Sequence, residues 1–129
     1  MSGLIISIDS SEIRQGKLDA LKLAIQDLVE FVESNEPRPI AYSVYLNTAG
    51  TQMTVLQIHP DSASMEYHMK VAKPAFSKFV DLIKLSAMDI YGTPSDDLLE
   101  MLRQKIQMLG SATMAVHNLH AGFTRYTTS

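Results

Sequence analysis

Residues 39–69 read PIAYSVYLNTAGTQMTVLQIHPDSASMEYHM, and this stretch decides the fold. It contains two apolar runs, 40–46 and 53–58, separated by mostly polar residues that include a glycine. Two such runs around a short glycine-containing loop predict the two strands of an antiparallel hairpin. The polar residues that follow predict a helix over 61–73, with Asp61 as its N-cap. The stretch therefore predicts a strand, a turn, a second strand and a helix.

The residues on either side of the hairpin extend this order. The short β-branched run 3–9 predicts a buried strand. The apolar stripe of 13–34 predicts a long helix, for which Asp9-Ser10-Ser11 supplies N-cap candidates. Pro74 is expected to break or kink the second helix, although apolar residues continue at helical spacing through 76–83. Residues 85–91 predict a further strand, which completes the ferredoxin-like β-α-β-β-α-β order of an α+β protein.

A further helix and strand are predicted after this core. Thr93 is the expected N-cap of the helix, with Pro94 at its first position, and Gly110 is well placed to end it. Residues 113–119 can form a last strand, and residues 120–129 form a polar tail dotted with aromatic residues.

The composition sets limits on the class of protein. The 129 residues fit one domain, which we expect to span 1–129 with a core over 3–92 and an extension over 93–129. The net charge is −3 and no basic cluster is present, so nucleic acid and anionic membranes are not expected partners. No apolar run has membrane-spanning length, and the start of the chain lacks the features of a signal peptide. Because the sequence has no cysteine, disulfides and thiolate metal sites are excluded, and we expect a cytoplasmic protein.

The two faces of the predicted hairpin can be sorted by alternation. Tyr42 shares one face with Ile40 and Val44, whereas Tyr45 lies on the other face. Neither face is cleanly polar, so both are expected to be covered. Helices of one chain can cover only one face of the sheet, and a second copy would cover the other. The pattern therefore predicts a homodimer.

Residues 40–45, 55–58 and 66–69, in this order of elements, carry a family resemblance over roughly the first two-thirds of the chain. The pattern resembles the antibiotic biosynthesis monooxygenase-like family. The resemblance implies a dimeric α/β barrel, in which the sheets of two protomers pack face to face with the helices outside. That family often has a Glu-x-His-Leu-like segment on the helix after the hairpin, and His68 falls on its histidine. The family often carries an aromatic residue, commonly tryptophan, near the end of the second hairpin strand, whereas this chain has no tryptophan and His59 stands near that place. A second histidine commonly follows the first on the helix in that family, but here Lys73-Pro74 occupies that region.

The resemblance implies a cofactor-independent monooxygenase-like protein that acts on a small aromatic or quinol-type substrate. His68 would be the base or orienting group, with His59 assisting. The residues expected to contact the substrate are Tyr42, Tyr45, Met53, Phe76 and His117. The alternative is a dimer without catalytic activity, which binds a small apolar ligand or is only a structural member of the fold. The missing tryptophan and second histidine favour this alternative.

Each candidate also has a purely structural interpretation. His68 can be a half-buried helix histidine bonded to a backbone carbonyl, and His59 can bond a turn carbonyl ahead of Pro60. The tyrosines can pack in the core or at an interface. No pair of histidines has the spacing of metal ligands, so a metal site is not expected. His117 and His120 can also belong to a strand and tail that lock a dimer.

Overall fold

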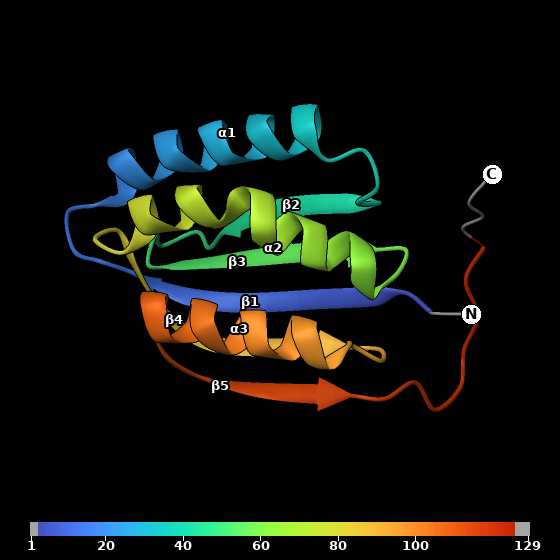
Figure 1. Cartoon of the computed structure of the whole chain (residues 1–129). Helices are drawn as coiled ribbons and strands as arrows, with labels where there is room; N and C mark the ends of the chain where they lie inside the picture. The colour runs from blue at the N-terminus through green and yellow to red at the C-terminus, as the bar shows by residue number, and fades with distance from the viewer. Residues whose placement is uncertain (1–2, 126–129) are drawn as a thin grey trace.

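The computed structural model describes residues 3–125 and places five strands and three α-helices within them (Figure 1). A short 3₁₀ turn, Ser77–Phe79, follows the second helix. In chain order the elements are β1 (Ile5–Ile13), α1 (Leu18–Asn35), β2 (Ala41–Leu46), β3 (Gln52–His59), α2 (Ser62–Phe76), β4 (Ile83–Tyr91), α3 (Asp96–Leu109) and β5 (Gly110–His117).

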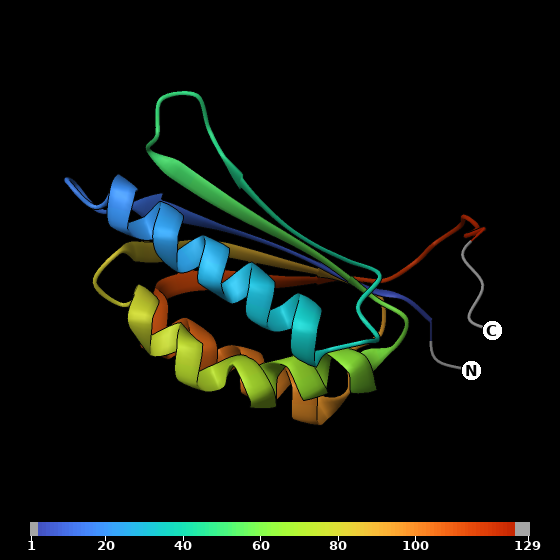
Figure 2. The ribbon, with the colours of Figure 1, turned by 90° about the horizontal axis from the view of Figure 1, so that it is seen from above.

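The strands form one sheet in the order β2-β3-β1-β4-β5. All neighbours pair antiparallel except β4 and β5, which are parallel. The three helices lie on the same face of the sheet and leave the other face open (Figure 2). The α+β fold and the ferredoxin-like order up to Tyr91 are therefore confirmed, with α3 and β5 added at one edge.

Alternation along each strand decides which side chains face the helices. On β3 the buried side chains are Met53, Val55, Gln57 and His59, which alternate along the strand and so share one face. On β1 the buried side chains are Ile5, Ser7, Asp9 and Ser11. Three of these four are polar, although they point into the layer between the sheet and the helices. The interior is therefore not a purely apolar core.

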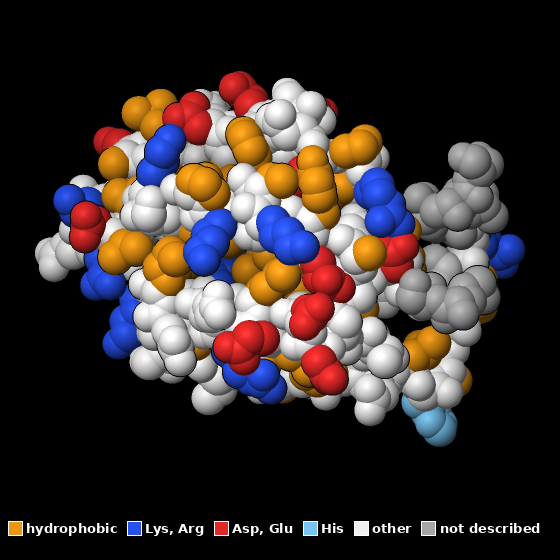
Figure 3. All heavy atoms as spheres, in the orientation of Figure 1, with side chains coloured by type: hydrophobic (Ala, Val, Ile, Leu, Met, Phe, Trp, Pro, Cys, Tyr) orange, Lys and Arg blue, Asp and Glu red, His pale blue; other side chains and the backbone are white. Residues whose placement is uncertain are grey.

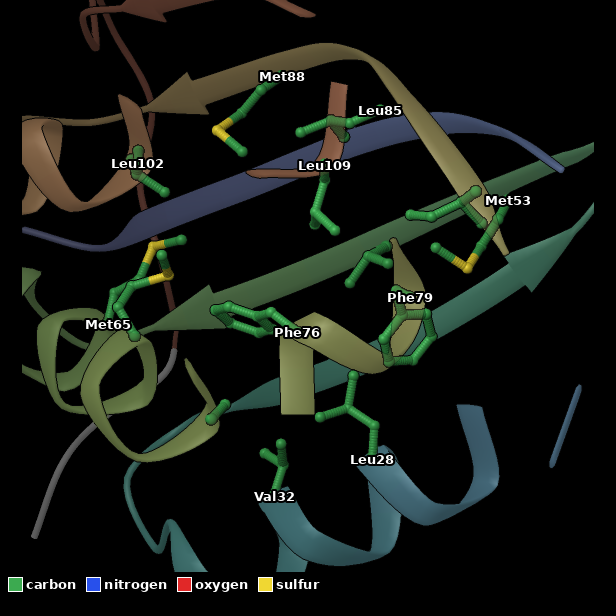
Figure 4. Packing of buried hydrophobic residues seen from close by; sticks show 14 of the residues in the cluster. Leu28, Val32, Met53, Met65, Phe76, Phe79, Leu85, Met88, Leu102 and Leu109 are labelled. Atoms are coloured by element: carbon green, nitrogen blue, oxygen red, sulfur yellow. The ribbon is translucent and has the colours of Figure 1, made fainter. Parts of the chain in front are cut away.

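Apolar side chains from all layers fill the space around these polar groups (Figure 4). Leu28 comes from α1, Met53 from β3, Leu85 from β4 and Leu109 from α3. Phe76, near the centre of this view, is one of the side chains through which α2 packs against this cluster. Burial of this area supplies the main driving force for packing the helices on the sheet.

The predicted boundary between the first strand and helix is wrong. Strand β1 continues to Ile13, so Asp9, Ser10 and Ser11 lie inside a strand and cap no helix. The strand is held on both sides by β3 and β4, and its register with β4 shifts at Ser10 and Ser11. Helix α1 starts only at Leu18, after a turn in which Gly16 adopts a positive φ of 77°.

The expected break at Pro74 is also wrong, because α2 continues through it to Phe76. Proline removes one backbone hydrogen bond, but the helix ends two residues later and the loss is confined to its last turn. Burial of Phe76 and Phe79 holds this turn against the core. Ile83, which was grouped with the helix, instead begins β4.

The extension starts and ends differently from the prediction. Ser95, not Thr93, is the N-cap of α3, and its Oγ accepts a hydrogen bond of 3.0 Å from the Leu98 backbone N–H. Ser95 also donates to Glu66 of α2, so the start of α3 is anchored to a neighbouring helix. Strand β5 begins at Gly110, three residues before the predicted start at 113. A Cβ at Gly110 would lie 2.5 Å from the Leu85 carbonyl oxygen, which explains the glycine at this parallel pairing.

Candidate functional site

A buried polar cluster lies between the sheet and the three helices. Its members come from β1, β3, the end of α1, α2 and α3, and are Ser7, Asp9, Ser11, Glu36, Gln57, His59, Ser64, His68 and Lys105. Burying ionisable groups is costly unless they are paired. The concentration of polar side chains in one interior layer makes this cluster the candidate functional site.

His68 and Glu36 form the central pair of this cluster. Glu36 ends α1, and both of its carboxylate oxygens lie 2.9 Å from His68 Nδ1. His68 is 0% exposed and Glu36 is 5% exposed. A carboxylate only accepts hydrogen bonds, so the Nδ1–H of His68 donates to it. This bond fixes the ring orientation and leaves Nε2 as the free nitrogen.

The Nε2 atom of His68 is buried and has no hydrogen-bond partner within residues 3–125. Leaving such an atom unpaired costs about 1–3 kcal/mol, so it calls for an explanation. The rings around it belong to Tyr42, Phe76 and His59, whose centroids lie 5.2, 6.0 and 6.0 Å from that of His68. A carboxylate-bound imidazole with a free Nε2 can act as a general base toward a ligand.

His59, by contrast, has both ring nitrogens occupied. Its Nδ1 lies 2.8 Å from Ser64 Oγ and its Nε2 lies 2.9 Å from Gln57 Oε1. Ser64 is itself fixed, because its backbone N–H donates to Asp61, which is confirmed as the N-cap of α2. Burial, and then the neighbouring His68, lowers the pKa of His59 to about 4. His59 is therefore neutral near pH 7 and built into the wall of the site.

The pKa of His59 predicts a pH dependence of stability. Unfolding restores a pKa near 6.5, so between about pH 4 and 6.5 the unfolded chain binds more protons than the folded chain. The stabilisation is fully present above this window and is lost as the pH falls through it. We expect the unfolding free energy from urea titrations to fall by about 2–3 kcal/mol more in wild type than in His59→Asn between pH 7 and 4.5. Equal losses in the two proteins would contradict this assignment.

Tyr42 faces the same interior from β2. Burial raises the pKa of its phenol far above the ordinary value, and the charges of Asp9 and Glu36 add to this effect. The phenol therefore keeps its proton and remains available as a hydrogen-bond donor.

A second ion pair lies across the interior, where Lys105 Nζ is 3.3 Å from Asp9 Oδ2. Asp9 is 3% exposed and Lys105 is 8% exposed, and the ammonium also lies 4.8 Å from the centre of the Phe76 ring. Asp9, Lys105, Tyr42 and Phe76 all line a cavity of about 30 Å³, whose apolar walls include Leu28, Met53, Leu85 and Leu109 (Figure 4). This is room for about one water, so a larger ligand requires these side chains to move.

Solved structures with a similar fold provide a comparison for this arrangement. MupZ from Pseudomonas fluorescens is 21% identical, with a TM-score of 0.75, over 97% of this chain and 91% of MupZ. A candidate antibiotic biosynthesis monooxygenase from Caulobacter crescentus is 18% identical, with a TM-score of 0.62, over 73% of this chain and 91% of its own. The chain has the fold of the antibiotic biosynthesis monooxygenase-like proteins.

SnoaB, a cofactor-independent oxygenase from Streptomyces nogalater, is 6% identical with a TM-score of 0.61, over 73% of this chain and 96% of SnoaB. These identities establish a shared fold, and the resemblance inferred from the sequence is confirmed at that level. The match to MupZ spans nearly the whole chain and so includes most of the extension. No protein-family model matches the sequence, and no curated protein matches it.

On this monooxygenase-like fold, the predicted candidates divide between the two faces of the sheet. His59, His68, Tyr42, Met53 and Phe76 all lie on the helix side, and the last three line the small cavity. The structure separates the other two candidates from this site. Tyr45 is 52% exposed on the open face. His117 lies at the end of β5, with its Nε2 2.9 Å from Asp89 and its ring stacked on Tyr91.

Three residues of the site, Glu36, Asp9 and Lys105, were not predicted from the sequence. Glu36 carries no local signal, because it simply precedes Pro37 at the end of a helix. Lys105 did have a local signal in the sequence, since it interrupts the buried stripe formed by Leu98, Leu102 and Leu109. Asp9 also had a local signal, because it is a charged residue on the buried face of a strand, but the sequence pattern was interpreted as a helix cap.

Among residues 3–125, no group of three His, Cys, Asp or Glu side chains is arranged to hold a metal ion. None of the helices in the described part of the chain has the length and apolar character needed to cross a bilayer.

Proposed function

We propose that this protein is a cofactor-independent monooxygenase-like enzyme that acts on an electron-rich phenol or quinol. One observation carries the proposal: a fully buried His68 whose Nδ1 is held by Glu36 and whose Nε2 has no partner in residues 3–125. The fold shared with SnoaB, a cofactor-independent oxygenase, supports the reaction class. At this level of identity, the assignment of the reaction to this chain rests on the site itself.

In the proposed reaction, His68 Nε2 accepts the phenol proton and Glu36 stabilises the resulting imidazolium. The phenolate is electron-rich enough to reduce dioxygen, and a bond forms between oxygen and the ring carbon para to the phenolate. The imidazolium gives its proton to the outer oxygen of this peroxide, and His68 Nε2 then takes the hydrogen of the same carbon as a proton. The electron pair of that C–H bond forms the new C=O bond as the O–O bond breaks, and the departing hydroxide takes the proton from the imidazolium to become water. The products are a quinone and one water, and all the electrons come from the substrate.

Tyr42 and Phe76 would control access to His68. Both rings flank the imidazole and both line the small cavity, so a substrate reaches Nε2 when one of them moves aside. The protonated Tyr42 phenol would then donate a hydrogen bond to a substrate oxygen. Closure of the rings would exclude water from the reacting centre.

A binding protein without catalytic activity is the alternative, and the composition of the cavity wall separates the two. A wall made only of Leu, Ile, Met and Phe would favour simple binding of an apolar ligand. Here a phenol, a carboxylate and an ammonium line the cavity at Tyr42, Asp9 and Lys105, with the His68 imidazole beside them. This convergence of polar groups supports an enzyme.

The open face of the sheet supports a homodimer, which is part of this proposal. Ile6, Ile8, Leu56 and Ile58 are only partly buried there, and no helix of the described chain lies over them (Figure 2). A second copy that packs its own open face on this one would cover them. We expect native mass spectrometry to give twice the 14.3 kDa mass of the chain. A monomer at micromolar concentration would contradict this.

The reaction class is tested with ¹⁸O-labelled dioxygen. Purified protein is incubated with a panel of phenols and hydroxynaphthalenes, without added metal or flavin, and oxygen uptake is recorded. We expect one labelled atom in the quinone that forms from a phenol, because the second oxygen atom leaves as water. Uptake that yields hydrogen peroxide and unlabelled quinone would indicate a simple oxidase. Retention of a phenol without any turnover would favour the binding protein.

A further inference from the structure

A second pocket, next to the buried cluster, lies between α2 and α3. Its volume is about 170 Å³, and its walls carry three methionines, Met69, Met101 and Met108, and one phenylalanine, Phe76. Methionine is flexible and polarizable, so such a wall adapts to apolar ligands of different shapes. On the helix side of the molecule, Figure 3 shows cationic side chains next to hydrophobic ones where these two helices run side by side.

The charge lining this pocket is of one sign. Lys70, Lys73 and Lys105 contribute ammonium groups, and Gln104 is the remaining lining residue. No carboxylate of the described chain lines the pocket, and neither Lys70 nor Lys73 forms an ion pair within residues 3–125. An apolar wall with unpaired cations at its edge is complementary to an apolar molecule that carries an anionic group.

Two residues are shared between the walls of this pocket and of the buried cavity. Phe76 and Lys105 line both the 170 Å³ pocket and the 30 Å³ cavity. The Phe76 ring also flanks His68 at 6.0 Å. Movement of the Phe76 side chain would therefore open a path from a molecule held at Lys70 and Lys73 toward the imidazole.

We propose that the pocket between α2 and α3 binds an apolar molecule with a carboxylate or similar anionic group, which pairs with Lys70 and Lys73. The apolar part of the molecule lies on Met69, Met101 and Phe76. If this molecule is the substrate, the pocket also defines the substrate class of the proposed monooxygenase, and that step rests on the proposed function. The substrate is then a phenol that also carries a separate anionic group.

The pocket is tested with two fluorescent probes that differ by one charge. Anilinonaphthalene sulfonate is an aromatic anion, and N-phenylnaphthylamine has the same rings without the sulfonate. We expect the double variant Lys70→Gln, Lys73→Gln to bind the anion about 3- to 10-fold more weakly, as expected for two partly exposed ion pairs. The affinity for the neutral probe should change by less than about twofold, because the apolar wall is intact. The wild-type preference for the anion should also weaken as salt is added.

A matched variant, Lys22→Gln, Lys78→Gln, removes two exposed lysines that do not line the pocket. If it weakens anion binding as much as the first variant does, or if the first variant loses both probes equally, the proposed pairing is overturned. Binding to His68→Asn separates this inference from the proposed function. The two lysine substitutions are repeated in the His68→Asn background. If they weaken anion binding there as much as in wild type, the anion site is supported independently of His68. If His68→Asn also retains turnover, the anion site is supported but the proposed reaction mechanism is wrong.

Discussion

Replacing His68 with asparagine should lower kcat/KM for the oxidation of a phenol by about 10²- to 10⁴-fold, the usual contribution of a positioned general base. The asparagine amide can still donate to Glu36 from near the Nδ1 position, but it has no atom that replaces Nε2. The substitution therefore removes the base and retains the contact with Glu36. Steady-state oxygen uptake measures the loss, and circular dichroism with urea unfolding checks that the protein is folded.

Two further variants sharpen this test. Glu36→Gln can present its amide N–H to Nδ1, which moves the ring proton to Nε2 and removes the lone pair, so we expect a fall of comparable size. His120→Asn changes an exposed histidine of the tail and should leave the rate unchanged. If folded His68→Asn retains the wild-type rate, His68 is not the base, and the unpaired nitrogen has another role.

The second large effect is expected at the ion pair between Asp9 and Lys105. Lys105→Met leaves the Asp9 carboxylate buried without its cation, and loss of one partner from a buried pair costs about 3–5 kcal/mol. Because Lys105 also lines the pocket between α2 and α3, water can partly replace it. We therefore expect the lower end of that range, about 3 kcal/mol, in urea unfolding at pH 7.

The double variant Asp9→Val, Lys105→Met completes a double-mutant cycle. It removes both charges and replaces them with apolar groups, so most of the lost stability should return. Lys70→Met serves as the matched control, because it changes an exposed lysine and should alter stability by no more than about 0.5 kcal/mol. A double variant as unstable as Lys105→Met would show that the lysine contributes through packing and not through its charge.

The sequence was sufficient for the elements whose signals are local. The hairpin, the Asp61 cap and the opposite orientation of Tyr42 and Tyr45 follow from alternation and capping, and the structure confirms all three. The errors arose where a local signal had two meanings. Asp9 and Ser11 are good N-cap residues, but here β1 is paired on both sides and continues through them.

The site was predicted only in part, because its key contacts join residues that are distant in the chain. His68 was a candidate, but its carboxylate lies 32 positions earlier in the sequence. Asp9 and Lys105 are 96 positions apart. No periodicity or spacing rule connects such pairs, since the packing of helices on the sheet brings them together. Tyr45 and His117 were also expected to contact the substrate, but both lie away from His68.

The extension that supplies Lys105 also limits how this chain can change over evolutionary time. A protein of the same fold that never acquired α3 and β5 needs no acid at the position of Asp9. Deleting them from this chain removes Lys105, which within residues 3–125 is the only ion-pair partner of Asp9. We therefore expect loss of the extension to be accompanied by a change at Asp9. The two features should be inherited as a unit, although most of the chain lies between them.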